Sequence, residues 1–320
     1  MTEGRSLTGG PTGPPTAAGE APTPLGDAAG GEIRTLWSDA WYDLRHKPLF
    51  WISSLLVVVL ITMAAMPTLF TDINPEHAVL ANSLEPPGGS AWFGYDLQGR
   101  DVYARTIYGA RTSILVGVLA MLVTTTVGLT VGIMAGYLGG WPDGVMSRIG
   151  DMFLGLPYVL GGIVILSSVA GVRSNPSEAA IMAAVILVLA VLAWPVTARV
   201  ARSSVLSVRA ADYVVAARAL GAGPRRLILR HILPNTVAPV IVIATLNVGA
   251  FIGAEATLSF LGIGLRSPVI SWGVAIADHQ DYVRNALHPM LFPALFLCVT
   301  VLAFVMLGEA IREALDPKLR

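Results

Sequence analysis

Six long stretches of this chain contain no charged side chain, and this pattern constrains the fold more than any other feature. The stretches are residues 49–70, 112–142, 152–172, 179–198, 232–254 and 289–308. A helix needs about 20 apolar residues to cross a bilayer, and each stretch is long enough. The sequence therefore predicts an all-α, polytopic membrane protein with six transmembrane helices. We place them at about 49–70, 112–138, 152–172, 179–198, 232–263 and 289–309.

Composition agrees with this prediction and divides the chain into two parts. Only 13% of the residues are charged, whereas a soluble globular chain carries about 25%. The first 35 residues are rich in Gly, Pro, Ala and Thr, which favours a disordered tail. We expect residues 1–35 to form a cytoplasmic tail and residues 36–320 to form the membrane domain.

The basic residues predict the orientation of the chain in the membrane. With the amino terminus in the cytoplasm, the inner connecting segments hold 15 of the 21 Lys and Arg residues, and the outer segments hold 6. Basic residues accumulate on the cytoplasmic side of membrane proteins. Both termini are therefore predicted to be cytoplasmic, with a long inner loop at about 199–231 and a large outer segment at about 71–111.

A few residues inside the predicted spans carry specific expectations. Gly128, Gly132 and Gly136 lie on one face of a helix, where small residues let a second helix approach closely. Pro157 and Pro195 remove backbone hydrogen bonds and predict kinks. Glu255 is an acid within the fifth span; such a residue either lines a pathway or is hydrogen-bonded at a helix contact, and both alternatives remain open.

The sequence contains no motif of a known catalytic, cofactor or metal site. It has no Gly-x-x-x-x-Gly-Lys-Ser/Thr phosphate loop, its five histidines are scattered, and its single cysteine, Cys298, lies in the last span. We therefore expect no enzyme activity in this chain. It either depends on an outside energy source or forms a passive pore.

The predicted inner loop contains signals for two short helices joined by a turn. Residues 213–220 favour a helix, Gly221 can adopt the left-handed conformation that ends helices, and Pro224 can begin a second helix that leads into span five. Composition alone favours the alternative, an ordinary basic loop on the cytoplasmic side.

The same segment closely resembles the coupling loop of ABC-importer permeases. The signature of that loop is Glu-Ala-Ala, three residues, Gly, nine residues and Ile-x-Leu-Pro. The matching residues are Ala216, Ala217, Gly221, Leu233 and Pro234. The sequence departs from the signature at Val215, which replaces the glutamate, and at His231, which replaces the isoleucine.

Three further segments resemble the dipeptide and oligopeptide branch of these permeases. They are residues 92–113, which contain Trp-Phe-Gly-Tyr-Asp-Leu-Gln-Gly-Arg-Asp-Val, residues 255–273 and residues 313–320. The resemblance extends from about residue 41 to residue 320. It implies the type I importer fold with a cytoplasmic coupling helix between spans four and five.

The resemblance also implies a function and partners. The chain would form half of a pathway that carries dipeptides or oligopeptides across the bacterial plasma membrane. Its partners would be the lipid bilayer, a second permease subunit, two ATPase subunits that hold ATP and Mg²⁺, and an extracytoplasmic substrate-binding protein, with no nucleic acid. Similar permeases carry nickel complexes, haem or glutathione, and these cargoes, like the less favoured passive channel, are the alternatives.

The resemblance assigns roles to named residues. The residues expected to couple the chain to an ATPase are Tyr213, Ala216, Ala217, Arg218, Gly221, Arg225 and Pro234. Asp96, Arg100 and Asp101 are expected at the outer mouth, in contact with the binding protein. Glu255 is the candidate pathway residue.

Overall fold

The computed structural model describes residues 36–172 and 177–315, which fold into helices joined by loops. The helices are α1 (Leu36–Arg45), α2 (Pro48–Ala65), α3 (Val102–Leu138), α4 (Gly140–Leu154), α5 (Tyr158–Val172), α6 (Glu178–Arg209), α7 (Asp212–Ala219), α8 (Pro224–Leu227), α9 (Leu233–Phe260), α10 (Trp272–His279) and α11 (His288–Leu315). A π-helical turn, Ile228–Ile232, joins α8 to α9, and short 3₁₀ turns occur at Pro67–Leu69, Leu80–Asn82 and Gln280–Tyr282. The predicted tail, residues 1–35, lies outside the described residues.

Five of these helical segments are long and apolar enough to cross a membrane by themselves: α2, α3, α6, the segment Pro224–Phe260 and α11. The pair α4 and α5 passes the same test together, with a bend of 90° between the two helices. The predicted third span, 152–172, is therefore not one continuous helix. It breaks before Tyr158, because Pro157 lacks an N–H group and disfavours helical geometry in the residue before it.

Several helices extend beyond the limits that hydropathy predicts. Helix α3 begins at Val102, where the Asp101 carboxylate accepts a hydrogen bond from the Ala104 N–H at 2.7 Å. Helix α6 continues to Arg209, well past the predicted limit at residue 198. Hydropathy indicates where the bilayer ends, whereas a helix ends only where a residue caps or breaks it.

The glycine stripe of α3 is a helix contact. A Cβ atom on Gly128 would lie 2.6 Å from the Thr197 Cβ, and one on Gly132 would lie 2.5 Å from the Ala198 carbonyl oxygen. A Cβ atom on Gly136 would approach the Val205 Cβ to 2.8 Å. The predicted role in close packing is confirmed, and α6 is the neighbouring helix.

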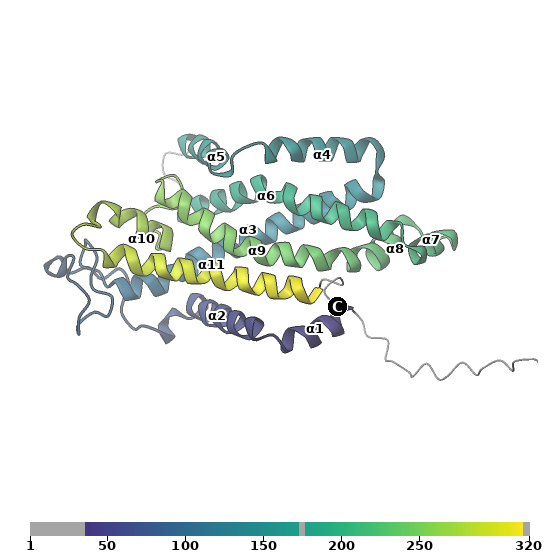
Figure 1. Ribbon diagram of the computed structural model, residues 1–320. Helices are drawn as coiled ribbons and strands as arrows, with labels where there is room; N and C mark the ends of the chain where they lie inside the picture. Colours follow the sequence, from purple (N-terminus) through teal and green to yellow (C-terminus); the bar gives the residue numbers. More distant parts are fainter. Residues whose placement is uncertain (1–35, 173–176, 316–320) are drawn as a thin grey trace, which may run out of the picture.

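Figure 1 shows an elongated bundle in which α3, α6, α9 and α11 run along one another. The outer segment before α3 and the short helix α10 lie at one end of the bundle, and α7 and α8 lie at the other. Helices α4 and α5 lie along one side of the bundle, and α2 lies on the opposite side next to α11 (Figure 1). The outer segment and the helix–turn–helix of α7 and α8, which hold most of the predicted site residues, therefore lie at opposite ends of the bundle.

Candidate functional sites

The first candidate site is the turn between α7 and α8. Gly221 has φ of +85°, and its N–H donates to the Arg218 carbonyl at 3.0 Å. The Ala222 N–H donates to the Ala217 carbonyl at 3.0 Å. This pair of bonds is a Schellman motif, which needs a left-handed residue at the position of Gly221. Pro224 then begins α8, so the predicted helix–turn–helix is confirmed.

Helix α7 presents most of its surface to solvent. Val214 is fully buried against the bundle, whereas Val215 is 51% exposed and Leu220 is 88% exposed. Arg218 and Arg225 are exposed as well. Exposed apolar residues gathered on a short helix with basic neighbours are typical of a protein-binding surface.

The residues predicted to couple the chain to a partner all lie in this region. Tyr213, Ala216, Ala217 and Arg218 lie in α7, Gly221 lies in the turn, Arg225 lies in α8 and Pro234 lies in the first turn of α9. The Asn235 side-chain N–H donates to the Tyr213 hydroxyl at 3.2 Å, and the Tyr213 ring lies 6.2 Å from that of His231. The departure from the family signature at His231 therefore supplies a contact between α7 and the π-helical turn, a kind of turn that is frequent at functional sites.

Helix α7 is also connected to α6 and α3. Only Ala210 and Ala211 separate α7 from the end of α6. The Arg209 guanidinium donates to the Gly136 and Tyr137 carbonyls at 3.0 and 3.1 Å, which satisfies carbonyl groups at the end of α3. Because α7 also contacts α9 through Tyr213, a displacement of α7 would act on α3, α6 and α9 together.

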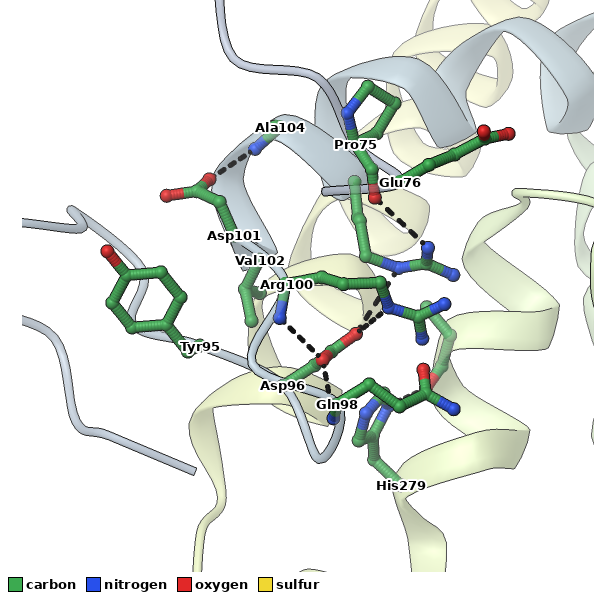
Figure 2. A network of polar contacts seen from close by, with 12 residues as sticks. Pro75, Glu76, Tyr95, Asp96, Gln98, Arg100, Asp101, Val102, Ala104 and His279 are labelled. Atoms are coloured by element: carbon green, nitrogen blue, oxygen red, sulfur yellow. Dashed lines mark hydrogen bonds and ion pairs between the residues drawn. The ribbon is translucent and has the colours of Figure 1, made fainter. Parts of the chain in front are cut away.

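The second candidate site is a polar network at the opposite end of the bundle (Figure 2). The Asp96 carboxylate accepts hydrogen bonds from the backbone N–H groups of Gln98 and Arg100 at 2.8 and 2.9 Å. It also pairs with the Arg100 side chain at 2.7 Å and with the Arg105 side chain at 3.5 Å. Arg105 donates in addition to the Pro75 carbonyl at 3.3 Å. The network joins the outer segment to the start of α3.

The three charged residues predicted for the outer mouth are largely buried: Asp96 and Arg100 belong to this network, and Asp101 caps α3. Asp96 is 1% exposed and Asp101 is 4% exposed, and the Arg100 side chain is 14% exposed. Burial raises the pKa of the Asp101 carboxyl, and backbone N–H donors at Ala104 and Tyr103 oppose that rise. These side chains therefore shape the outer segment and offer little surface to a partner.

Other residues of the same segment are exposed. Leu80 is 74% exposed and Trp92 is 69% exposed. Gly99, at φ of +70°, keeps its backbone against the Val79 carbonyl, where a Cβ atom would lie only 1.9 Å from the oxygen. The sequence reasoning missed Leu80, Trp92 and the buried Arg105, because only the folded loop separates exposed from buried positions.

Glu255 occupies a third polar position, inside the bundle. It is fully buried, and one carboxylate oxygen accepts hydrogen bonds from the Ser259 and Ser271 hydroxyls at 2.8 and 3.2 Å. Ser271 caps α10, so Glu255 links α9 to that helix. These contacts are those of an acid at a helix contact, and the pathway role of Glu255 stays a prediction.

Comparisons with known proteins agree with this arrangement. Residues 128–320 match the family model of the binding-protein-dependent transport system inner membrane component. Residues 35–87 match the N-terminal transmembrane domain of oligopeptide transport permease C.

Relatives with permease names align with most of the chain. The dipeptide transport system permease protein DppC of Alkalihalophilus pseudofirmus is 35% identical over 89% of this chain and 90% of its own length. The oligopeptide transport system permease protein OppC of Bacillus subtilis is 35% identical, with 89% and 91% covered. The glutathione transport system permease protein GsiD of Escherichia coli O157:H7 is 33% identical, with 90% and 93% covered.

Solved structures share the fold. An inward-facing methionine ABC transporter superposes with a TM-score of 0.53 at 20% identity, covering 66% of this chain and 96% of that one. An amino acid ABC transporter superposes with a TM-score of 0.50 at 18% identity, covering 64% and 91%. The chain therefore belongs to the family of inner-membrane components of binding-protein-dependent transport systems.

Proposed function

We propose that this chain is one of two membrane subunits of an ATP-driven importer for dipeptides and short oligopeptides. The observation that carries the proposal is its similarity to dipeptide and oligopeptide permeases at 35–38% identity over about nine-tenths of its length. The second permease subunit completes the pathway, and two partner ATPases bind and hydrolyse ATP with Mg²⁺.

Helix α7 is the element that receives the motion of an ATPase subunit. Its exposed apolar side chains Val215 and Leu220 fit into a groove of that subunit, and Arg218 and Arg225 contact acidic groups around it. Its contact with α9 through Tyr213, and the bond from Arg209 at the adjoining end of α6 to α3, support this role. When the ATPases close around ATP, α7 moves as a lever and the long helices reorient.

The outer segment is the docking surface for the substrate-binding protein. The buried Asp96 network and Gly99 hold this segment in one conformation. The exposed Leu80 and Trp92 then provide the contacts. Residues Asp96, Arg100 and Asp101 act indirectly, by keeping those contacts in place.

Glutathione is the second candidate cargo, because GsiD proteins are 33% identical over 90% of the chain. Glutathione is itself a short peptide, so the two candidates differ in the cargo and share the mechanism.

Uptake into proteoliposomes tests the proposal. The complete transporter, with its partner permease, ATPases and binding protein, is supplied separately with a labelled dipeptide, a labelled tetrapeptide and labelled glutathione. We expect ATP-dependent uptake of the dipeptide or tetrapeptide that is lost when this chain is omitted. Uptake of glutathione and of neither peptide would make glutathione the cargo. ATP-independent flux through this chain alone would contradict the importer mechanism.

A further inference from the structure

A cavity of about 320 Å³ lies between α3, α4 and α6, lined by the C-terminal halves of the three helices. Its walls are partly apolar, with Val131 from α3, Met146 and Leu154 from α4, and Trp194 from α6. Asp151 of α4 and Arg199 of α6 also line it. Its volume falls within the range of small-molecule sites, which are mostly apolar with a few placed polar groups.

Two ion pairs of different geometry join α4 to α6 at the cavity; only Arg202 of one pair lines it, whereas both members of the other, Asp151 and Arg199, do. Arg202 donates to both carboxylate oxygens of Asp143, one of them at 2.6 Å, and the Asp143 side chain is only 17% exposed. Asp151 and Arg199 form a single contact of 2.9 Å, with side chains 53% and 65% exposed. Exposed single ion pairs contribute little to stability, whereas a bidentate pair has fixed geometry. The first pair therefore holds α4 on α6, and the second can open at little cost.

We propose that this cavity is a low-affinity site for a short peptide in transit, with Asp151 and Arg199 exchanging their mutual contact for the two ends of the peptide. The Asp151 carboxylate accepts from the terminal ammonium group, and the Arg199 guanidinium donates to the terminal carboxylate. The apolar walls take up a side chain. This inference rests on the proposed function, because it assumes that peptides pass through the subunit.

The chemistry of the cavity favours peptide ends over other ligands. A carrier of peptides with varied side chains can recognise only the groups that all of them share, which are the backbone and its two charged ends. An anion alone would be repelled by Asp151 and a cation alone by Arg199, so the pair selects a molecule that carries both charges. A zwitterionic lipid headgroup has the same pair of charges and is the competing occupant.

Photolabelling of the assembled transporter tests the site. The complex of both permeases and both ATPases, in lipid nanodiscs without binding protein or nucleotide, is irradiated with a dipeptide of alanine and photo-leucine. We expect labelled residues among Met146, Leu154 and Trp194. Asp151→Asn should weaken labelling by about tenfold for the free dipeptide and leave an N-acetylated dipeptide unaffected. Arg199→Gln should weaken labelling by the free dipeptide by a similar factor and leave labelling by a dipeptide with a C-terminal amide unchanged.

A matched pair of controls lies on α11. Glu309 and Arg312 form another exposed ion pair, at 3.4 Å, far from the cavity in sequence. Glu309→Gln and Arg312→Gln should leave labelling unchanged. Met146→Trp, which fills the apolar part and keeps both charges, should abolish labelling, and gel filtration shows that each variant still assembles.

Three results would overturn the site. The first is labelling outside the cavity, and the second is equal labelling by a dipeptide that is blocked at both ends. The third is labelling that phosphatidylethanolamine displaces and unlabelled peptides do not, which would assign the cavity to lipid. Uptake with the binding protein is measured in parallel. Normal peptide uptake with any of these results removes only the cavity site, whereas absence of uptake for every peptide removes the proposed function and the site together.

Discussion

Gly132 shows how strongly one residue determines the contact between two long helices. A methyl group at this position would meet the Ala198 carbonyl at 2.5 Å and the Ala201 Cβ at 2.6 Å, and both belong to the rigid α6. We expect Gly132→Ala to destabilise the protein by about 1–3 kcal/mol, the usual cost of overpacking.

Thermal unfolding in detergent measures this effect. Gly253→Ala is the control, because Gly253 also lies in a membrane-spanning helix and has open space where its Cβ would be. The control should leave the unfolding midpoint nearly unchanged. Equal midpoints for Gly132→Ala and the unmodified protein would show that α3 and α6 do not pack as closely as described.

Asp96 is the residue on which the outer segment depends most. Asp96→Ala removes the shared partner of Arg100 and the buried Arg105. Loss of one member of a buried ion pair costs about 3–5 kcal/mol. We expect faster hydrogen exchange across residues 72–101 in this variant, measured by mass spectrometry.

Asp72→Ala tests whether that effect is specific. Asp72 is an exposed acid of the same segment, so its removal changes the charge equally without touching the network. Hydrogen exchange in this control should stay at the unmodified rate. Exchange that rises equally in both variants would mean that net charge, and not the buried network, orders the segment.

Residue-level prediction from sequence succeeded where the requirement was local. The left-handed turn at Gly221 and the glycine face of α3 follow from neighbouring residues. The burial of Asp96, Arg100 and Asp101 does not, because it depends on how the whole outer segment folds; Arg105, for example, pairs with Asp96 and also donates to the carbonyl of Pro75, 30 residues away. A charged residue in a loop looks the same in a sequence whether the fold buries it or exposes it.

At the level of elements, hydropathy located the membrane segments but not the ends of the helices. Helix α6 reaches Arg209 because no residue between Ala198 and Arg209 caps or breaks it. The third span divides at Pro157, and Pro195 lies within the continuous helix α6. A proline therefore indicates a weakened helix, and tertiary packing decides whether it breaks.

The α7–α8 turn gives a prediction at this scale. Gly221→Ala has open space for its methyl group, so its only cost is the left-handed backbone, about 1–2 kcal/mol. Gly221→Asn should cost less, because asparagine tolerates this conformation. We expect the ratio of peptide transported to ATP hydrolysed to fall in the order unmodified, Asn, Ala.

Gly223→Ala is the matched control for that series. Gly223 lies two residues away with φ of −68° and open space around its Cβ position. Its substitution should leave the coupling ratio unchanged. A Gly221→Ala variant that couples as well as this control would show that the turn does not set the position of α7.

At the level of the whole molecule, the distribution of basic residues predicts that the two ends of the bundle face opposite compartments. The single cysteine allows a direct test in a Cys298→Ala background. Leu80→Cys lies on the exposed outer segment, and Arg312→Cys replaces an exposed side chain near the end of α11. A membrane-impermeant maleimide should label the first in intact cells and the second only after the membrane is opened. The reverse pattern would invert the topology.

The overall architecture was predictable because it rests on features that a sequence displays directly. Six apolar stretches predict the membrane helices, and Gly221 and Pro224 predict the turn between α7 and α8. The cavity beneath α4 was not predictable, because it depends on how α4 folds back over α3 and α6 after the turn at Gly139, which has φ of +66°.

The most direct test of the central claim is the ATPase activity of the reconstituted transporter, with its binding protein, in the presence and absence of a dipeptide. The proposed function predicts that the dipeptide stimulates ATP hydrolysis, and that stimulation disappears when this chain is omitted or carries Gly221→Trp. Stimulation that persists at the unmodified level with Gly221→Trp, in a complex that still assembles, would contradict the role of α7 as the coupling element.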